Sequence, residues 1–135
     1  MQQQDAVTIV RMWQDAANRQ DVERLLELSD PNIEIIGPRG SGYGRELLRA
    51  WLSRAGLTLE TRQVFVRDAV VVLWQHGVWR SVETGDEMGA TDLASRFRVA
   101  GGRVTQYARY ESLQTALDQA GLSAADAIAQ HEPAA

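Results

Sequence analysis

The chain has 135 residues, 44% of them hydrophobic, and a formal net charge of −4 at pH 7. This length suits one domain with a buried core and is too short for two. The scattered arginines argue against nucleic-acid binding, and no apolar run approaches the roughly 20 residues of a membrane span. The N-terminus lacks the pattern of a secretory signal, so we expect a cytoplasmic protein.

Missing residue types exclude several kinds of chemistry. The chain has no cysteine, which removes thiol catalysis and thiolate metal sites. All fourteen basic residues are arginine, so Schiff-base chemistry and a P-loop lysine are also excluded. Two histidines, His76 and His131, are too few for a histidine-rich zinc site. We therefore expect no metal and no cofactor, and the available chemistry is that of carboxylate, tyrosine, histidine and arginine side chains.

The first part of the chain has the pattern of two helices. Residues 5–18 place Val7, Val10 and Trp13 on one stripe at helical spacing. Asp21 can cap a second short helix.

A short strand and a third helix follow. Pro31 is expected to end the second helix, and residues 32–36 predict a strand. The glycine-rich residues 37–44 predict a loop. Residues 45–55 have an apolar helical face, and Gly56 is a plausible helix terminator.

The second half of the chain is mostly strand, with one closing helix. A turn signal lies at 84–86 and a hairpin turn at 100–103. Residues 112–120 predict a helix ended by Gly121, and Ser123 to Asp126 resembles a capping motif for one more short helix. The tail after Gln130 is expected to fray. The predicted strands cover residues 57–66, 69–79, 91–99 and 104–110.

The order of helices and strands predicts an α+β domain. Three helices of the N-terminal half should pack on a strongly curved mixed or antiparallel sheet, with a further helix near the C-terminus. We expect one domain over residues 1–122 and a short helix and tail over 123–135. A bent sheet closed by helices forms a cone, whose mouth is a natural ligand site.

Three stretches resemble the nuclear transport factor 2-like superfamily, with its SnoaL-like, polyketide-cyclase-like and ketosteroid-isomerase-like members. They are Trp13-Gln-Asp-Ala-Ala-Asn-Arg-Gln-Asp21, Gly42-Tyr-Gly-Arg-Glu46, and Phe97-Arg-Val-Ala-Gly-Gly-Arg-Val104 with the following Tyr110-Glu-Ser. The resemblance covers residues 5–122. It implies a cone-shaped, cystatin-like roll around one small-molecule pocket, and a homodimer formed through the sheet face.

The known catalytic groups of the superfamily do not transfer to this chain. Trp13 stands where steroid isomerases have their oxyanion-hole tyrosine, and Gly37 stands where they have the general-base aspartate. Arg109 stands where epoxide hydrolases have a carboxylate on the last strand. The arginine and aspartate partners of that carboxylate fall near Gln75 and Gly77 in this chain. An enzyme built on this chain would need a different set of residues.

One predicted strand carries a charged pair, Asp92 and Arg98. Their even spacing puts them on one face, where they could form an oriented base or an anion clamp. The alternative leaves them in solvent and turns Leu93, Phe97 and Val99 toward the helices.

Tyr107, Arg109 and Tyr110 lie on the last strand. Resemblance to epoxide hydrolases puts Tyr107 and Arg109 inside, where an arginine would attract a carboxylate or enolate. The alternative is an outward position at a sheet edge or dimer contact.

Two further residues are candidate bases. His76 has the side chain that most easily acts as a base near neutral pH, although a lone histidine in a strand is more often structural. Glu34 would have a raised pKa if it were buried, and an exposed position on an edge strand is equally compatible with the pattern.

The function predicted from these residues is a cofactor-independent acid–base enzyme acting on a small, largely apolar, oxygenated substrate. It would be an isomerase, cyclase, dehydratase or epoxide-hydrolase-like protein. The alternative is a non-catalytic ligand-binding or dimerisation domain with a degenerate pocket. The candidate catalytic residues are His76, Glu34, Asp92, Arg98 and Arg109, and the candidate substrate-binding residues are Trp13, Trp51, Trp74, Trp79, Phe97, Tyr107 and Tyr110. We expect two of the four tryptophans to fill the core and one or two to reach the pocket.

Overall fold

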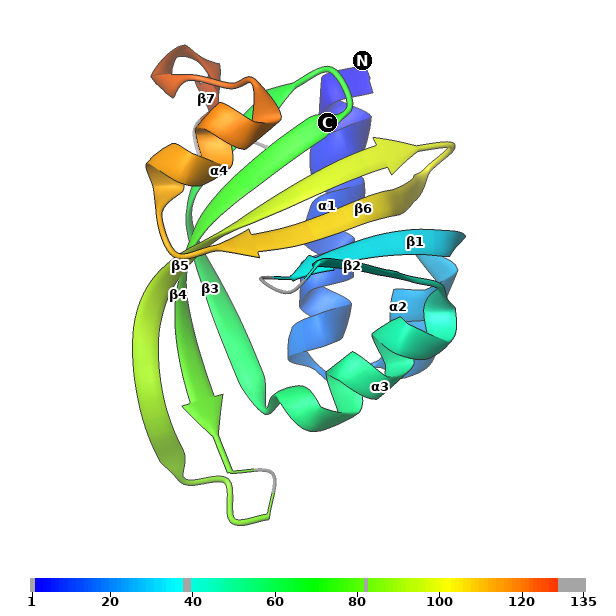
Figure 1. Cartoon of the computed structure of the whole chain (residues 1–135), viewed down its shortest axis with the longest axis vertical. Helices are drawn as coiled ribbons and strands as arrows, with labels where there is room; N and C mark the ends of the chain where they lie inside the picture. The colour runs from blue at the N-terminus through cyan, green and yellow to red at the C-terminus, as the bar shows by residue number, and fades with distance from the viewer. Residues whose placement is uncertain (1, 38–39, 82, 129–135) are drawn as a thin grey trace.

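The computed structural model describes residues 2–37, 40–81 and 83–128. Helices pack on both faces of one strongly curved sheet (Figure 1). The helices are α1 (Gln2–Asn18), α2 (Val22–Glu27), α3 (Arg45–Ala55) and α4 (Leu113–Ala120), with a 3-10 turn η1 at Ala124–Asp126. The strands are β1 (Ser29–Gly37), β2 (Gly40–Tyr43), β3 (Leu57–Arg67), β4 (Val70–Arg80), β5 (Glu87–Ala100), β6 (Arg103–Tyr110) and β7 (Ala127–Ile128).

The sheet is mixed and has the strand order β2-β1-β6-β5-β4-β3-β7. Strand β1 runs parallel to β6, while every other pair is antiparallel. Register shifts interrupt the pairing within β3 and near the end of β4, and such bulges bend and twist a sheet. The predicted α+β class with a curved mixed sheet is confirmed.

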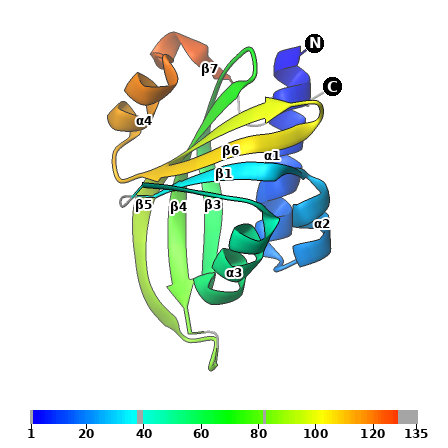
Figure 2. The same ribbon diagram turned by 45° about the vertical axis from the view of Figure 1, so that its right-hand side comes forward.

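Side-chain alternation divides the sheet into two faces. The inner face, covered by α1, α2 and α3, takes Val71, Leu73 and Phe97 into the main core. The outer face takes the intervening residues, and there Val72 and Ala94 pack against α4. Figure 2 shows α1 and α4 on opposite sides of the strands. Leu93, Phe97 and Val99 are buried while Asp92 and Arg98 are exposed, which confirms the alternative orientation of this strand.

Some element boundaries differ from the prediction. Pro31 does not stop a helix; it lies inside β1, which begins at Ser29. The pairing of β1 with β6 shifts register between Ser29 and Glu34, and an irregular stretch of this kind tolerates a residue without an N–H group. The glycine-rich segment is also not only a loop, because Gly40–Tyr43 pairs with β1.

The end of α4 provides a test of backbone strain. Gly121 follows α4 with a φ of 73°, and a Cβ atom there would have no neighbour within 4 Å. The Gly121→Ala variant should therefore lose about 1 kcal/mol of stability through strain alone, as measured by urea denaturation. Gly89→Ala is the matched control, since Gly89 also has open space but no positive φ. Equal stability of the two variants would contradict the strain argument.

Candidate functional site

Four aromatic rings from four different elements meet on the inner face. Trp13 of α1 is fully buried, and its ring centroid lies 5.3 Å from that of Phe97 on β5 and 5.0 Å from that of Tyr107 on β6. Trp51 of α3 completes the group, 6.3 Å from Trp13 and 5.6 Å from Tyr107. Trp51 is only partly buried, so one side of this cluster is open to solvent.

Arg109 lies at the open side of the aromatic cluster. Its Cζ atom is 5.5 Å from the ring centroid of Trp51 and 5.9 Å from that of Tyr107. Its Nε and Nη2 atoms donate hydrogen bonds of 3.3 and 3.1 Å to the Tyr107 hydroxyl. The inward orientation expected for Tyr107 and Arg109 is confirmed, while their roles stay predictions.

A buried polar network adjoins this cluster. Gln75 Nε2 donates to Gln14 Oε1 at 3.0 Å, and Ser95 Oγ donates to Gln75 Oε1 at 2.7 Å. Gln14 in turn donates to Asn18, whose side chain holds the backbone of Leu59. The network ties α1 to the sheet, and Ser95 stands opposite Arg109 in the strand register.

Sequence reasoning did not propose Gln14 or Ser95 as site residues, and considered Gln75 only as the place of a missing partner. The sequence nevertheless contains a pattern that indicates Gln75 and Ser95. Gln75 shares its strand face with Leu73, and Ser95 shares its face with Leu93 and Phe97, so both are polar residues at core positions. A polar side chain at such a position needs a buried partner, which predicts a network.

His76 and Asp92 face away from Arg109. They are cross-strand partners on the outer face, and His76 Nδ1 lies 2.9 Å from Asp92 Oδ1. Their side chains are 35% and 59% exposed. The structure thus joins two predicted catalytic residues to each other but not to the aromatic cluster.

Glu34 belongs to a second outer-face group. Its carboxylate accepts hydrogen bonds from Ser41 at 2.7 Å, from Gln106 at 2.9 Å and from Tyr43 at 3.3 Å. The Ser41 bond, followed by that of Gln106, lowers the pKa of Glu34 below its ordinary value. Glu34 is not buried, so the condition for a raised pKa is not met, and these donors lower its pKa by stabilising the charged form.

The remaining predicted residues are divided between the two faces. Arg98 is exposed on the outer face, and Tyr110 accepts a hydrogen bond from Arg96 there. Trp74 packs with Tyr110 in the cluster under α4, so it cannot line an inner-face site. Trp79 packs on a smaller apolar group of the inner face with Leu57, Leu59 and Leu93.

Lowering the pH tests whether the Glu34 carboxylate accepts these hydrogen bonds in the folded protein. A carboxyl group whose pKa is lowered on folding adds stability above its unfolded pKa, about 4.3, and this contribution is lost as the pH falls through the folded value. The Glu34→Gln variant should therefore lose less stability than the parent between neutral pH and about pH 3, measured by urea denaturation. Ser41→Ala, which removes the largest cause of the shift, should give an intermediate slope. An unchanged slope in Glu34→Gln would contradict this assignment.

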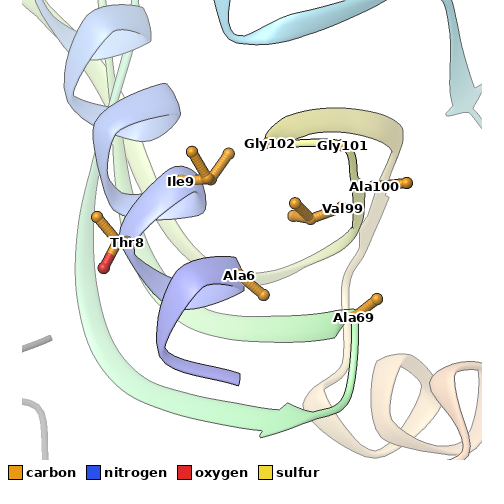
Figure 3. A pocket seen from close by; sticks show the side chains of 8 residues that line it. All are labelled: Ala6, Thr8, Ile9, Ala69, Val99, Ala100, Gly101 and Gly102. Carbon is orange, nitrogen blue, oxygen red and sulfur yellow. The ribbon is translucent and has the colours of Figure 1, made fainter. Parts of the chain in front are cut away.

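One surface pocket of about 410 Å³ has none of the predicted site residues in its lining. Figure 3 shows it between the first turns of α1, with Ala6 and Ile9, and the turns at Ala69 and Gly101. None of its lining residues is ionisable. Arg109 is seven residues from Gly102 along β6, which is roughly 20 Å of strand, so the two places are distinct. The lining residues are Ala6, Thr8, Ile9, Ala69, Val99, Ala100, Gly101 and Gly102.

Two structural features are absent from residues 2–37, 40–81 and 83–128. No helix among them is long and apolar enough to cross a membrane. They contain no group of three or more histidine, aspartate and glutamate side chains arranged to hold a metal ion.

Known structures share this fold. The protein Bal32a from a soil-derived mobile gene cassette is 22% identical, with a TM-score of 0.72 over 89% of this chain and 98% of that one. A polyketide cyclase homologue from Xanthomonas campestris pv. campestris is 23% identical, with a TM-score of 0.69 over 89% and 99% of the two chains. A Mycobacterium tuberculosis protein in complex with estradiol-17beta-hemisuccinate is 17% identical, with a TM-score of 0.70 over 82% and 95%. At these identities the likeness shows the fold.

A search of curated proteins finds no match to the chain. The model of the SnoaL-like domain matches residues 10–107, from the middle of α1 to the inner-face Tyr107. This range includes every element that builds the aromatic cluster, and the nuclear transport factor 2-like resemblance is confirmed. The chain therefore belongs to the SnoaL-like domain family.

Proposed function

We propose that this protein binds a small, flat, oxygenated molecule on the inner face of its sheet. The observation that carries the proposal is the position of Arg109, which lies over the ring of Trp51 and bonds to the Tyr107 hydroxyl while remaining partly exposed. Aromatic rings provide a surface for a flat ligand, and the guanidinium and phenol fix an oxygen atom. The complex of a structural relative with estradiol-17beta-hemisuccinate supports small-molecule binding by this fold.

The same two groups can stabilise negative charge that develops on a substrate oxygen. Donors fixed before the reaction stabilise an enolate or tetrahedral oxyanion, as a cofactor-independent isomerase, cyclase, dehydratase or hydrolase requires. Within the described residues, neither Arg109 nor Tyr107 forms a hydrogen bond or ion pair with a carboxylate or an imidazole. The inner face therefore supports ligand binding and oxyanion stabilisation better than proton abstraction by a side chain.

A second candidate is acid–base catalysis at His76. Its hydrogen bond to Asp92 has the form of a base held by an orienting carboxylate. This site would use the outer face, where Arg109 cannot assist.

Binding can be tested with nitrogen–proton NMR of the tryptophan indoles. Acetonaphthone and naphthoate, one neutral and one anionic, should both shift the Trp51 signal and leave the outer-face Trp74 signal unmoved. Signals can be assigned with Trp51→Phe and Trp74→Phe variants. If neither probe moves the Trp51 signal, the proposed binding site is wrong.

Catalysis can be tested by deuterium exchange at the methyl group of acetonaphthone, next to its carbonyl. Exchange that disappears in Arg109→Gln supports oxyanion stabilisation on the inner face. Exchange that disappears only in His76→Gln supports the outer-face base. No exchange above buffer in the parent protein supports a non-catalytic binder.

A homodimer formed through the sheet and a cytoplasmic location also stay proposals. Light scattering of the purified protein measures the mass in solution and would contradict the dimer if it gave that of one chain.

A further inference from the structure

Within residues 2–37, 40–81 and 83–128, no carboxylate forms an ion pair with Arg109. Its hydrogen bonds to these residues both go to the neutral hydroxyl of Tyr107. Glu111 lies two residues along the chain, but its carboxylate makes no ion pair with the guanidinium. A cation held against Trp51 therefore has no counter-ion within the described part of the protein.

The hydrogen-bond inventory of the site is also unbalanced toward donors. Guanidinium has five N–H groups, and in the described part of the chain only Nε and Nη2 of Arg109 have an acceptor. The Tyr107 oxygen accepts both of these bonds, so its own O–H group must point elsewhere, and the described residues offer it no acceptor.

The two imbalances have one common solution. A ligand oxygen that carries negative charge accepts the spare N–H and O–H groups and neutralises the guanidinium at the same time. A flat conjugated system attached to this oxygen can lie along the ring of Trp51, which is partly open to solvent. A neutral ligand of the same shape can accept these hydrogen bonds, but it leaves the charge of the guanidinium without a counter-ion.

We infer that the ligand of the inner face is a conjugated acid bound as its anion, a carboxylate or an ionised enol, with Arg109 as the residue that determines this specificity. The inference rests on the proposed function, because it names the ligand class of that same site.

The experiment compares ligands of one shape and different charge. Naphthoate and ionised hydroxynaphthoquinone are the two anionic probes, and naphthamide is the neutral match of naphthoate. Calorimetry near neutral pH should show naphthoate binding at least roughly tenfold more tightly than naphthamide, a difference of ~1.4 kcal/mol. A preference for only one of the anions would separate carboxylates from enols.

Variants identify the source of the preference. Arg109→Gln should bind naphthoate and naphthamide about equally, while Arg109→Lys should keep part of the preference because it keeps the charge. Arg103→Gln is the matched control, an exposed arginine on the same strand, and should keep the preference in full. Folding of each variant is checked from its NMR spectrum.

Two results would overturn the inference and leave the proposed function standing. They are equal affinity of the parent for naphthoate and naphthamide, and an undiminished preference in folded Arg109→Gln. If no probe shifts the Trp51 signal, the proposed function and this inference fail together.

Discussion

Replacing Trp13 with alanine should destabilise the protein by about 3–5 kcal/mol. The side chain is fully buried, and its ring contacts Trp51, Phe97 and Tyr107. Its Nε1–H group also donates to Ser29 Oγ at 2.9 Å. Alanine would leave a cavity between α1 and the sheet that the surrounding rings cannot fill.

Urea denaturation of three proteins would check this value. Trp13→Phe keeps most of the ring contacts and loses the hydrogen bond to Ser29, so its loss of stability should be smaller than that of Trp13→Ala. Met88→Ala is the surface control, because Met88 is 74% exposed, and should change stability by less than about 0.5 kcal/mol. A loss below about 1 kcal/mol in Trp13→Ala would mean that the cluster is not packed as described.

Gln75→Leu should cost about 2–4 kcal/mol, although leucine is more apolar than glutamine and has a similar size. The substitution removes the donor to Gln14 and the acceptor of the Ser95 hydroxyl, and both partners are buried. An unsatisfied buried polar group costs about 1–3 kcal/mol, which outweighs the gain from a more apolar side chain.

A double-mutant cycle separates the network from simple packing. Ser95→Ala removes one of the orphaned partners, so Gln75→Leu should cost less in the Ser95→Ala background than in the parent. Additive losses would show that the hydrogen bond between the two side chains contributes nothing measurable. Denaturation by urea gives all four free energies of unfolding.

Much of the fold could be predicted because local patterns and tertiary packing agree. The apolar stripe of α1, the Asp21 cap of α2 and the glycine terminators of α3 and α4 all occur in the structure. The pairing of β1 with β6 has no local signal, since it joins residues at opposite ends of the chain. The two-residue strand β7 is too short for its alternation to be visible.

The site was harder to predict than the fold, because its residues depend on which face each strand presents. Alternation in β5 indicated that Asp92 faces solvent, whereas a role as an oriented base or anion clamp required the interior, and the structure agrees with alternation. The inward position of Arg109 followed from resemblance alone. Its contact with Trp51 joins a helix and a strand that are far apart in sequence, so no spacing rule could reveal it.

The parallel pairing of β1 with β6 has a consequence for the order of events during synthesis. Strand β1 emerges from the ribosome early, but its inner neighbour β6 is among the last elements made. Until then only the short β2 can cover one side of β1, and the other side keeps unpaired backbone groups. A nascent or truncated chain that ends before β6 should therefore be prone to aggregation and dependent on chaperones. This holds even though all three helices that cover the inner face are already complete.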